Sequence, residues 1–266
     1  MTAARLRARL AACKQEGRAA LVVYVTAGDP DAAQAADVVA AIAAAGADVI
    51  ELGVPFSDPS ADGPAIQAAM ERALAAGGGL HQALATVAAV RARGVTTPIV
   101  LFGYYNPIFV MGVDRFAAAA AEAGVDAVLT VDLPIDELDE LRAPLTAHAL
   151  GVIPLVAPTS TPERIARVRA VDAPFVYYIS LTGVTGAAFD AARLSAARVD
   201  DIRAASGAPV VVGFGIKTAD DVRAVAALAD GVVVGSALVE RIGRAPAGEA
   251  APAVGAFVAE LRAALG

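Results

Sequence analysis

The sequence has few of the residues on which several common kinds of chemistry depend. Its 266 residues include one cysteine, Cys13, two histidines, His81 and His148, and two lysines, Lys14 and Lys217. A single cysteine forms no intrachain disulfide and no cysteine cage for a metal. Neither histidine has a histidine or cysteine partner at metal-ligand spacing, and both fall in helical segments expected to face solvent. Redox chemistry and a metal-dependent mechanism are therefore disfavoured.

Basic clusters and long apolar runs are also missing. The net charge is −7, and without a basic cluster there is no electrostatic footprint for nucleic acid or an anionic membrane. The hydrophobic share is 57%, much of it alanine, but no stretch reaches the about 18 strongly apolar residues of a membrane span. The first residues show no signal core or cleavage site. We expect a cytoplasmic protein that binds neither nucleic acid nor membrane.

Short apolar runs rich in β-branched residues recur along the chain, each followed by a helical segment. There are eight, at residues 21–25, 49–52, 99–102, 127–131, 152–156, 175–179, 210–212 and 232–234. Continuously apolar runs predict parallel strands buried on both faces. Eight such units predict one (β/α)8 barrel domain over residues 1–266, with its site at the strands' carboxyl ends. The alternative, a doubly wound open sheet, would want a Gly-x-Gly-x-x-Gly turn, and residues 26–30 read Thr-Ala-Gly-Asp-Pro.

Two further helices are expected outside these eight units. Residues 1–14 and 253–265 have apolar side chains at helical spacing, with Cys13 as a core thiol in the first. Both should pack against the outside of the barrel. Pro144 falls within the helical segment 135–150 and is expected to divide it into two short pieces, opening the second.

The stretch from residue 48 to residue 67 places two carboxylates around one loop. Glu51 stands among apolar neighbours where a strand ends, and glycines and prolines then prevent regular structure until Asp62, which we expect to cap a helix. Desolvation should raise the pKa of Glu51 and suit it to proton transfer. Taken singly, Glu51 is explained as an ion-paired strand residue and Asp62 as a plain cap. Together in one loop they favour a catalytic pair.

Three glycine-rich loops follow the sixth, seventh and eighth expected strands. They read Gly-Val-Thr-Gly at 183–186, Gly-Phe-Gly-Ile at 213–216 and Gly-Ser-Ala at 235–237. Their backbone amides, with the N-terminus of a short helix beginning at Ser236, would form an anion cradle without a basic side chain. Each loop alone is explained by a tight turn, but their positions together predict a phosphate ester as ligand.

Few other acids, bases or nucleophiles are available. No Gly-x-Ser-x-Gly elbow or Ser-His-Asp set is evident, which leaves the carboxylates and Tyr177. Lys217 could form a Schiff base, but its place at the start of a helix favours a solvated or phosphate-flanking role. Carbon chemistry would therefore need a substrate that supplies its own electron sink.

Aromatic residues gather at or just past the strand ends. They are Tyr24, Phe102, Tyr104, Tyr105, Tyr177 and Phe214. Barrel packing explains any one of them equally well, but the set favours an apolar pocket for a flat aromatic ligand.

Several motifs together resemble the α subunit of tryptophan synthase. They are Ile-Glu-Leu-Gly-Val-Pro-Phe-Ser-Asp-Pro at 50–59, Ala-Asp-Gly-Pro at 61–64, and the segments 26–30, 105–107, 132–134, 183–186, 213–216 and 235–236. The resemblance covers nearly the whole chain. It implies a (β/α)8 barrel lyase of tryptophan biosynthesis that cleaves indole-3-glycerol phosphate to indole and glyceraldehyde 3-phosphate by a retro-aldol reaction. It also implies no cofactor in this chain and an αββα heterotetramer with a β subunit that carries pyridoxal phosphate.

The resemblance assigns roles to individual residues. Glu51 would be the acid/base, Asp62 would hold the indole N–H as positive charge develops, and Tyr177 would help to position Glu51. Protonation of the indole at C3 makes an indolenine, which accepts the electrons of the breaking bond without a lysine or a metal. The expected substrate-binding residues are Tyr24, Phe102, Thr185 and Phe214, and the expected phosphate-binding residues are Gly186, Gly215, Gly235 and Ser236.

Three positions depart from the family's usual pattern and bear on loop packing and subunit contact. Ser60 replaces an apolar residue, Gly103 a bulkier one, and Leu181 an arginine found in some members. The loops 55–60 and 183–190 have few side chains able to anchor them. We expect both loops to be mobile when unbound, and the chain alone to be slow until a β subunit orders them.

Two other functions remain as alternatives. The chain could be a weak or inactive phosphate-binding barrel that regulates a partner, although the presence of both Glu51 and Asp62 argues against it. It could also be a neighbouring phosphate-binding isomerase or cyclase, which would typically show a lysine or an acid/base pair on other strands.

Overall fold

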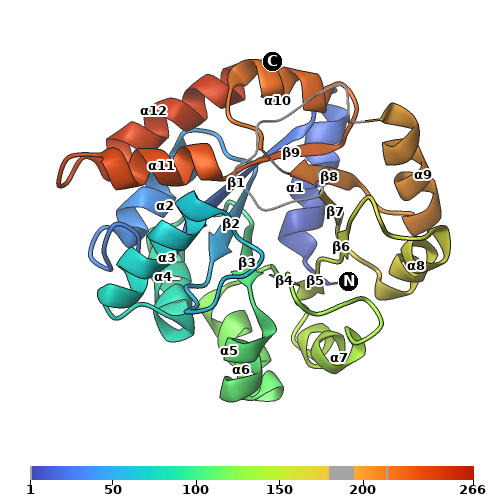
Figure 1. Cartoon of the computed structure of the whole chain (residues 1–266), viewed down its shortest axis with the longest axis horizontal. Coiled ribbons are helices and arrows are strands. Elements are labelled where there is room, and N and C mark those ends of the chain that lie inside the picture. The colour runs from blue at the N-terminus through green and yellow to red at the C-terminus, as the bar shows by residue number, and fades with distance from the viewer. Residues whose placement is uncertain (1, 180–194, 214) are drawn as a thin grey trace.

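The strands form a parallel barrel with helices around it. The computed structural model describes residues 2–179, 195–213 and 215–266. Within them the strands are β1 Ala20–Thr26, β2 Val49–Gly53, β3 Ile99–Gly103, β4 Ala127–Thr130, β5 Gly151–Val152, β6 Leu155–Val156, β7 Val176–Ile179, β8 Val210–Gly213 and β9 Gly231–Val234. Neighbours pair in parallel in the order β5-β4-β3-β2-β1-β9-β8-β7-β6. Figure 1 looks along this barrel, which is the predicted (β/α)8 fold with an extra helix at each end.

The fifth barrel strand is interrupted, so nine strand segments of the described residues stand where eight strands were predicted. β5 pairs with β4 and β6 with β7, and Ile153 and Pro154 lie between them. Proline has no N–H to donate to the neighbouring strand, yet residues 153 and 154 keep their place between β4 and β7. The Ile153 amide donates to the Val128 carbonyl at 2.9 Å, and the Pro154 carbonyl accepts from the Tyr177 amide at 3.0 Å. The predicted strand at 152–156 is thus one barrel strand in two pieces.

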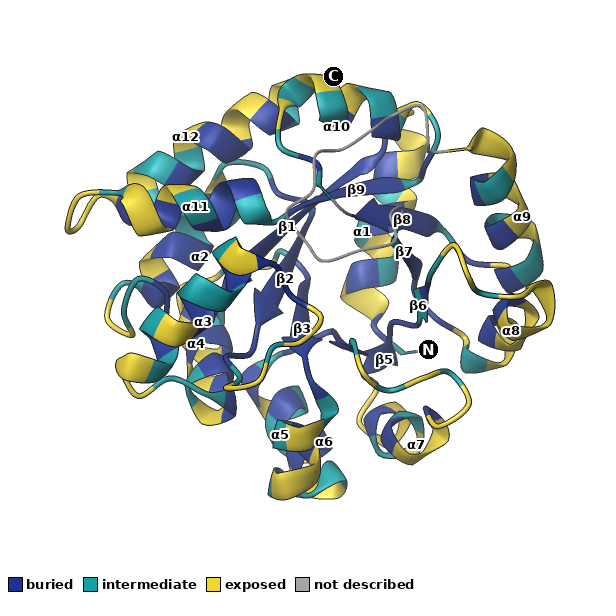
Figure 2. Ribbon diagram, in the orientation of Figure 1, coloured by how far each residue is buried: buried dark blue, intermediate teal, exposed yellow. Residues whose placement is uncertain are grey.

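Alternate residues of each strand face two different cores. On β1, Val23 and Val25 pack against the surrounding helices, whereas Val22 and Tyr24 belong to the cluster inside the barrel. Figure 2 shows the strands almost entirely buried and the outer helices buried on one side. Burial on both faces is the reason for the continuously apolar runs in the sequence.

The outer helices follow the strands in order. They are α2 Ala35–Ala44, α3 Pro64–Ala75, α4 Leu80–Ala92, α5 Tyr105–Met111, α6 Val113–Ala123, α7 Asp139–Ala147, α8 Pro162–Arg167 with a 3-10 turn at Val168–Val171, α9 Ala196–Ser206, α10 Ala219–Ala226 and α11 Ser236–Arg244. No single described helix is long and apolar enough to cross a membrane, although α3 and α4, bent by 90° where they meet, pass that test as a pair.

The two terminal helices take different places. α12, Ala250–Ala263, packs outside the barrel against α2 and α11, as predicted. α1, Ala4–Gln15, does not lie on the outside, because Leu6, Leu10 and Cys13 join the cluster inside the barrel. It lies at the far end of the barrel in Figure 1. The amphipathic pattern predicted the helix but could not say which surface it covers.

Helix α7 runs through Pro144, so the predicted division into two pieces was wrong. The proline removes only the hydrogen bond that its own nitrogen would have donated. Leu141 and Leu145 are fully buried on the same face, and their packing holds the helix together across this position.

Candidate active site

Glu51 lies inside the barrel on β2, beside Tyr24 of β1 and Val100 of β3. Its side chain is fully buried, and neither carboxyl oxygen has a hydrogen-bond partner among the described residues. Burial raises the pKa of Glu51 to about 8, because desolvation disfavours the charged form. At neutral pH the carboxyl group is therefore mostly protonated, and it can give up a proton and take one back.

Glu51 faces a cavity of about 110 Å³ at the carboxyl ends of the strands. Tyr24, Asp62, Phe102 and Tyr177 also line this cavity. The Phe102 ring meets Tyr24 edge-on, with centroids 5.3 Å apart, and is tilted against Tyr177 at 6.2 Å. The structure thus brings together the two predicted carboxylates and three predicted aromatic residues, and the wall they form suits a flat apolar ligand.

Two glycines leave room for the phenol groups in this cavity. A Cβ at Gly53 would lie 2.1 Å from the Tyr24 hydroxyl, and a Cβ at Gly213 would lie 2.0 Å from the Tyr177 hydroxyl. Any other residue at either position would displace a tyrosine. Burial raises the pKa of both tyrosines well above its ordinary value, so both hydroxyls keep their protons. No hydrogen bond joins Tyr177 to Glu51 in the described residues, and its positioning role stays a prediction.

Asp62 reaches the cavity from the loop between β2 and α3, and the prediction that it caps α3 was wrong. The cap position is Gly63, no side chain caps the helix, and Pro64 at the first position has no N–H to satisfy. The Asp62 carboxylate instead accepts a hydrogen bond from the Tyr104 hydroxyl at 2.6 Å. Burial raises the pKa of Asp62, and this hydrogen bond opposes the rise.

Three predicted phosphate-binding residues line the same cavity. Gly215, Gly235 and Ser236 meet there, at the start of α11. The first amides of a helix have no partner within it and favour an anion. Lys217 follows β8 and does not line the cavity; its amide donates to the Asp221 carboxylate at 3.0 Å. The position fits the prediction that Lys217 has no catalytic part.

Some of the predicted residues lie outside the described part of the chain. Thr185, Gly186 and Phe214 are among them, as are Leu181 and the loop 183–190. Their predicted roles, and the predicted mobility of that loop, therefore stay predictions.

The loop after β2 packs against the end of β3 at its start, and its later residues, such as Ser60, are exposed. A Cβ at Gly103 would lie 3.2 Å from the Val54 Cβ, so the glycine lets the loop approach closely. Phe56 stacks on Tyr104, with ring centroids 5.0 Å apart. Ser60 is exposed. Of the departures from the family's pattern, Gly103 thus has a packing role, whereas nothing in the structure gives Ser60 one.

Tyr104 is the residue whose contact the sequence did not predict. It and Tyr105 were expected to line the pocket, but neither lines the cavity that holds Glu51. The Tyr104 hydroxyl points instead to Asp62, which lies 42 positions earlier. A contact over that separation leaves no local pattern that could have indicated it.

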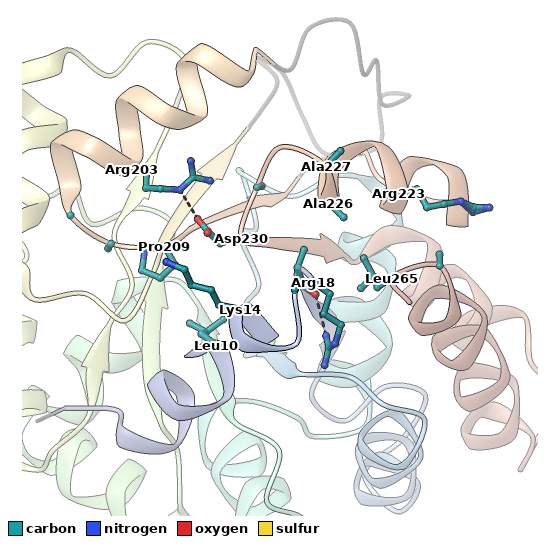
Figure 3. A pocket seen from close by; sticks show the side chains of 16 residues that line it. Leu10, Lys14, Arg18, Arg203, Pro209, Arg223, Ala226, Ala227, Asp230 and Leu265 are labelled. Carbon is teal, nitrogen blue, oxygen red and sulfur yellow. Dashed lines mark hydrogen bonds and ion pairs between the residues drawn. The ribbon is translucent and has the colours of Figure 1, made fainter. Parts of the chain in front are cut away.

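A larger hollow, of about 610 Å³, lies at the opposite end of the barrel. Figure 3 shows it beside Lys14, with Arg203 turned to Asp230; those two side chains are 3.0 Å apart. Another of its cations, Arg18, is bound to Asp48 at 2.6 Å. Because these arginines already have carboxylate partners, and because this end of a (β/α)8 barrel serves stability, the smaller cavity is the candidate site. In the described residues no three His, Cys, Asp or Glu side chains gather as a metal site.

Comparisons with known proteins identify the family of this chain. The family profile described as tryptophan synthase alpha chain matches residues 10–263. The tryptophan synthase alpha chain of Burkholderia pseudomallei is 51% identical over 261 residues, which cover 98% of this chain and 96% of the relative. That of Geobacter sulfurreducens is 51% identical over 262 residues, covering 98% and 99%.

Solved structures give the same result. The crystal structure of tryptophan synthase subunit alpha from Legionella pneumophila has a TM-score of 0.91 and 38% identity, covering 99% of this chain and 98% of that one. A chain of Mycobacterium tuberculosis tryptophan synthase has a TM-score of 0.89 and 39% identity, covering 98% of each. On the profile, the relatives and the fold together, this chain belongs to the tryptophan synthase alpha chain family.

Proposed function

We propose that this chain acts in tryptophan biosynthesis as a lyase that cleaves indole-3-glycerol phosphate to indole and glyceraldehyde 3-phosphate. The observation that carries the proposal is Glu51, a buried carboxyl group without a partner among the described residues that faces a cavity. Burying such a group without a partner costs stability, and groups of this kind are concentrated at functional sites. Membership of the tryptophan synthase alpha chain family supports an indole compound as the substrate.

The first step is the transfer of a proton to the indole ring. Glu51, protonated at neutral pH, gives its proton to C3 of the indole, and the ring becomes an indolenine with positive charge at nitrogen. Asp62, on the same cavity, accepts the indole N–H and stabilises that charge. The pair therefore separates the two duties, with a neutral acid in one position and an anion in the other.

The second step breaks the carbon–carbon bond. The Glu51 carboxylate takes the proton of the hydroxyl group on the carbon attached to C3, and that carbon becomes the aldehyde carbon of glyceraldehyde 3-phosphate. The electron pair of the broken bond returns to the ring, which becomes aromatic again with its N–H retained. One proton has moved from hydroxyl to C3, Glu51 is restored, and no water, metal or oxidant is consumed.

The phosphate group would be held at the start of α11. Gly215, Gly235 and Ser236 line the cavity there, and the helix N-terminus supplies backbone N–H donors and a favourable dipole. Binding the phosphate remote from the reacting bond fixes the indole against Glu51 and Asp62, which lowers the entropic cost of the proton transfers.

The experiment is incubation of the purified chain with indole-3-glycerol phosphate and detection of free indole and of glyceraldehyde 3-phosphate. The two products should appear in equal amounts. A Glu51→Gln variant purified in the same way is the control for a contaminating enzyme. Absence of indole from the wild-type chain, with and without a β subunit, would favour the alternative of a regulatory barrel without activity.

We also propose that a β subunit carrying pyridoxal phosphate covers the mouth of this barrel in an αββα assembly. The support is a pair of exposed apolar side chains on α5, Phe109 at 61% and Val110 at 75% exposure, the largest such exposure among the described residues. α5 begins beside Tyr104, which holds the loop that carries Asp62. An apolar partner surface there would lie next to the catalytic loop.

The partner proposal predicts that the cognate β subunit accelerates indole release. Phe109→Ser combined with Val110→Ser should keep the rate of the isolated chain and lose the acceleration, because both side chains are exposed and neither lines the cavity. Equal rates with and without the β subunit in the wild-type chain would remove the activation hypothesis and leave the lyase proposal standing.

A further inference from the structure

The Asp62 carboxylate is held by a side chain from a neighbouring loop. The Tyr104 hydroxyl donates to Asp62 Oδ2 at 2.6 Å and accepts from the Ala61 amide at 3.0 Å. The tyrosine ring stacks on Phe56. Burial, then the Asp62 carboxylate and more weakly the Asp132 carboxylate, raises the pKa of Tyr104. The hydroxyl therefore keeps its proton, and both ring and hydroxyl have a fixed place.

We propose that Tyr104 is a positioning residue for the cleavage reaction, whose hydroxyl keeps the Asp62 carboxylate oriented as an acceptor for the indole N–H. This inference rests on the proposed function. Tyr104 does not line the cavity, so it acts through Asp62 and does not touch the substrate. It is distinct from Tyr177, which lies on the cavity wall.

The backbone of the loop has a second, separate support. The Gln67 side chain on α3 donates to the Asp62 carbonyl at 2.8 Å. Removal of the Tyr104 hydroxyl therefore leaves the loop attached to α3 and the aromatic stack in place. The Asp62 carboxylate loses its donor and the Ala61 amide loses its acceptor, but the Gln67 contact and the aromatic stack still hold the loop, so a positioning effect can be separated from a folding effect.

The groups around Asp62 indicate how its pKa should change when the Tyr104 hydroxyl is removed. Tyr24 of β1, Glu51 of β2 and Tyr177 of β7 line the same cavity, and none of them donates a hydrogen bond to Asp62 in the described residues. Burial raises the pKa of Asp62 and the Tyr104 hydroxyl lowers it. Without that donor the carboxylate takes up a proton at a higher pH, because only the charged form gains from the bond.

The test is the pH profile of kcat for indole release by Tyr104→Phe. A hydrogen bond to a charged group is strong enough to move the acidic limb upward by about one pH unit and to lower kcat by roughly tenfold at neutral pH. The basic limb, which follows the loss of the Glu51 proton, should stay in place, and KM should change little. The matched control is Tyr105→Phe, which removes a neighbouring buried hydroxyl that has no partner among the described residues.

A second measurement separates a positioning role from a structural one. In the Asp62→Asn background, Tyr104→Phe should cost no further activity, because its effect passes through the carboxylate. A profile equal to wild type, a fall in kcat with an unmoved acidic limb, or full additivity with Asp62→Asn would each overturn the inference. These outcomes require a wild-type chain that releases indole. A wild-type chain without this activity would instead overturn the proposed function, and this inference with it.

Discussion

Two buried acidic residues near opposite ends of β2, Asp48 and Glu51, have opposite surroundings. At the amino end, Asp48 is 1% exposed and is bonded to Arg9, to Arg18 and to the amide of Leu21. Burial alone would raise the pKa of Asp48, but these bonds outweigh it and lower the pKa. At the carboxyl end, Glu51 is equally buried, and its carboxyl oxygens have no partner among the described residues.

The difference lies in what surrounds each group, since burial is the same. A carboxylate with its hydrogen-bonding capacity filled joins parts of the chain and stays charged. A carboxyl group without partners is held protonated and can exchange its proton with a ligand. Asp62 lies between these cases, because one hydroxyl holds it and its other acceptor sites remain available. The number of hydrogen-bond partners, more than burial, thus distinguishes the structural acid Asp48 from the proposed catalytic acid Glu51.

The largest expected effect is on the catalytic end. Glu51→Gln keeps the shape of the side chain but cannot exchange a proton, so indole release should fall by about 10²- to 10⁴-fold. Binding of a phosphate ligand, measured by calorimetry, should be nearly intact. A variant with half the wild-type rate would show that Glu51 is not the acid of the reaction, and its contrast with Asp48 would then have no catalytic meaning.

Substitution of Asp48 at the amino end should lower the stability of the chain without lowering kcat. Asp48→Asn leaves Arg18, whose side chain is 5% exposed, without its buried counter-charge, and the free energy of unfolding should fall by about 3 to 5 kcal/mol. The matched control is Asp37→Asn, which breaks the exposed pair with Arg93 and should cost less than about 1 kcal/mol. Denaturant unfolding measures both. A large fall in kcat of the folded Asp48→Asn chain would contradict the comparison.

Glu51 should also give stability a distinctive pH dependence. Its pKa is raised from 4.5 to about 8 on folding, so between these values the unfolded chain binds fewer protons than the folded chain. Stability should fall as the pH rises through this interval, and by pH 8 Glu51→Gln should be more stable than wild type by a few kcal/mol, as an order of magnitude. Parallel curves of unfolding free energy against pH for the two chains would show that Glu51 is ionised in the fold.

Asp62→Asn tests the residue whose hydrogen bonding lies between that of Asp48 and that of Glu51. Loss of the negative charge should lower indole release by on the order of 10²-fold, because the positive charge of the indolenine loses its partner. Stability should change little, since Asp62 caps no helix. Unchanged turnover with a marked drop in melting temperature would assign Asp62 a structural role instead.

The smallest effect is expected at Lys217. It does not line the cavity that holds Glu51, and a substrate whose own ring accepts electrons needs no Schiff base. Lys217→Ala should therefore keep most of the turnover. Covalent trapping of the substrate on this lysine by borohydride would overturn the carboxylate mechanism.

Much of the barrel could be predicted because its signals are local. The strand runs and the start of α11 at Ser236 each depend on residues near one another in the sequence. Two of the errors share one cause, which is competition from distant packing. Buried Leu141 and Leu145 hold α7 together across Pro144, and the buried side chains of α1 join the core inside the barrel from its far end instead of packing on its outer face.

The (β/α)8 fold, the family and the two candidate carboxylates could be predicted from consecutive residues, because apolar periodicity, turn residues and a dense motif are local signals. Local signals do not show that Glu51 has no partner among the described residues while Asp48 has several, or that Tyr104 donates to Asp62. These contacts join positions far apart in the chain, since Asp48 meets Arg9 across 39 residues and Asp62 meets Tyr104 across 42. Whether a buried charge is satisfied depends on which distant groups the closed barrel brings within hydrogen-bond distance.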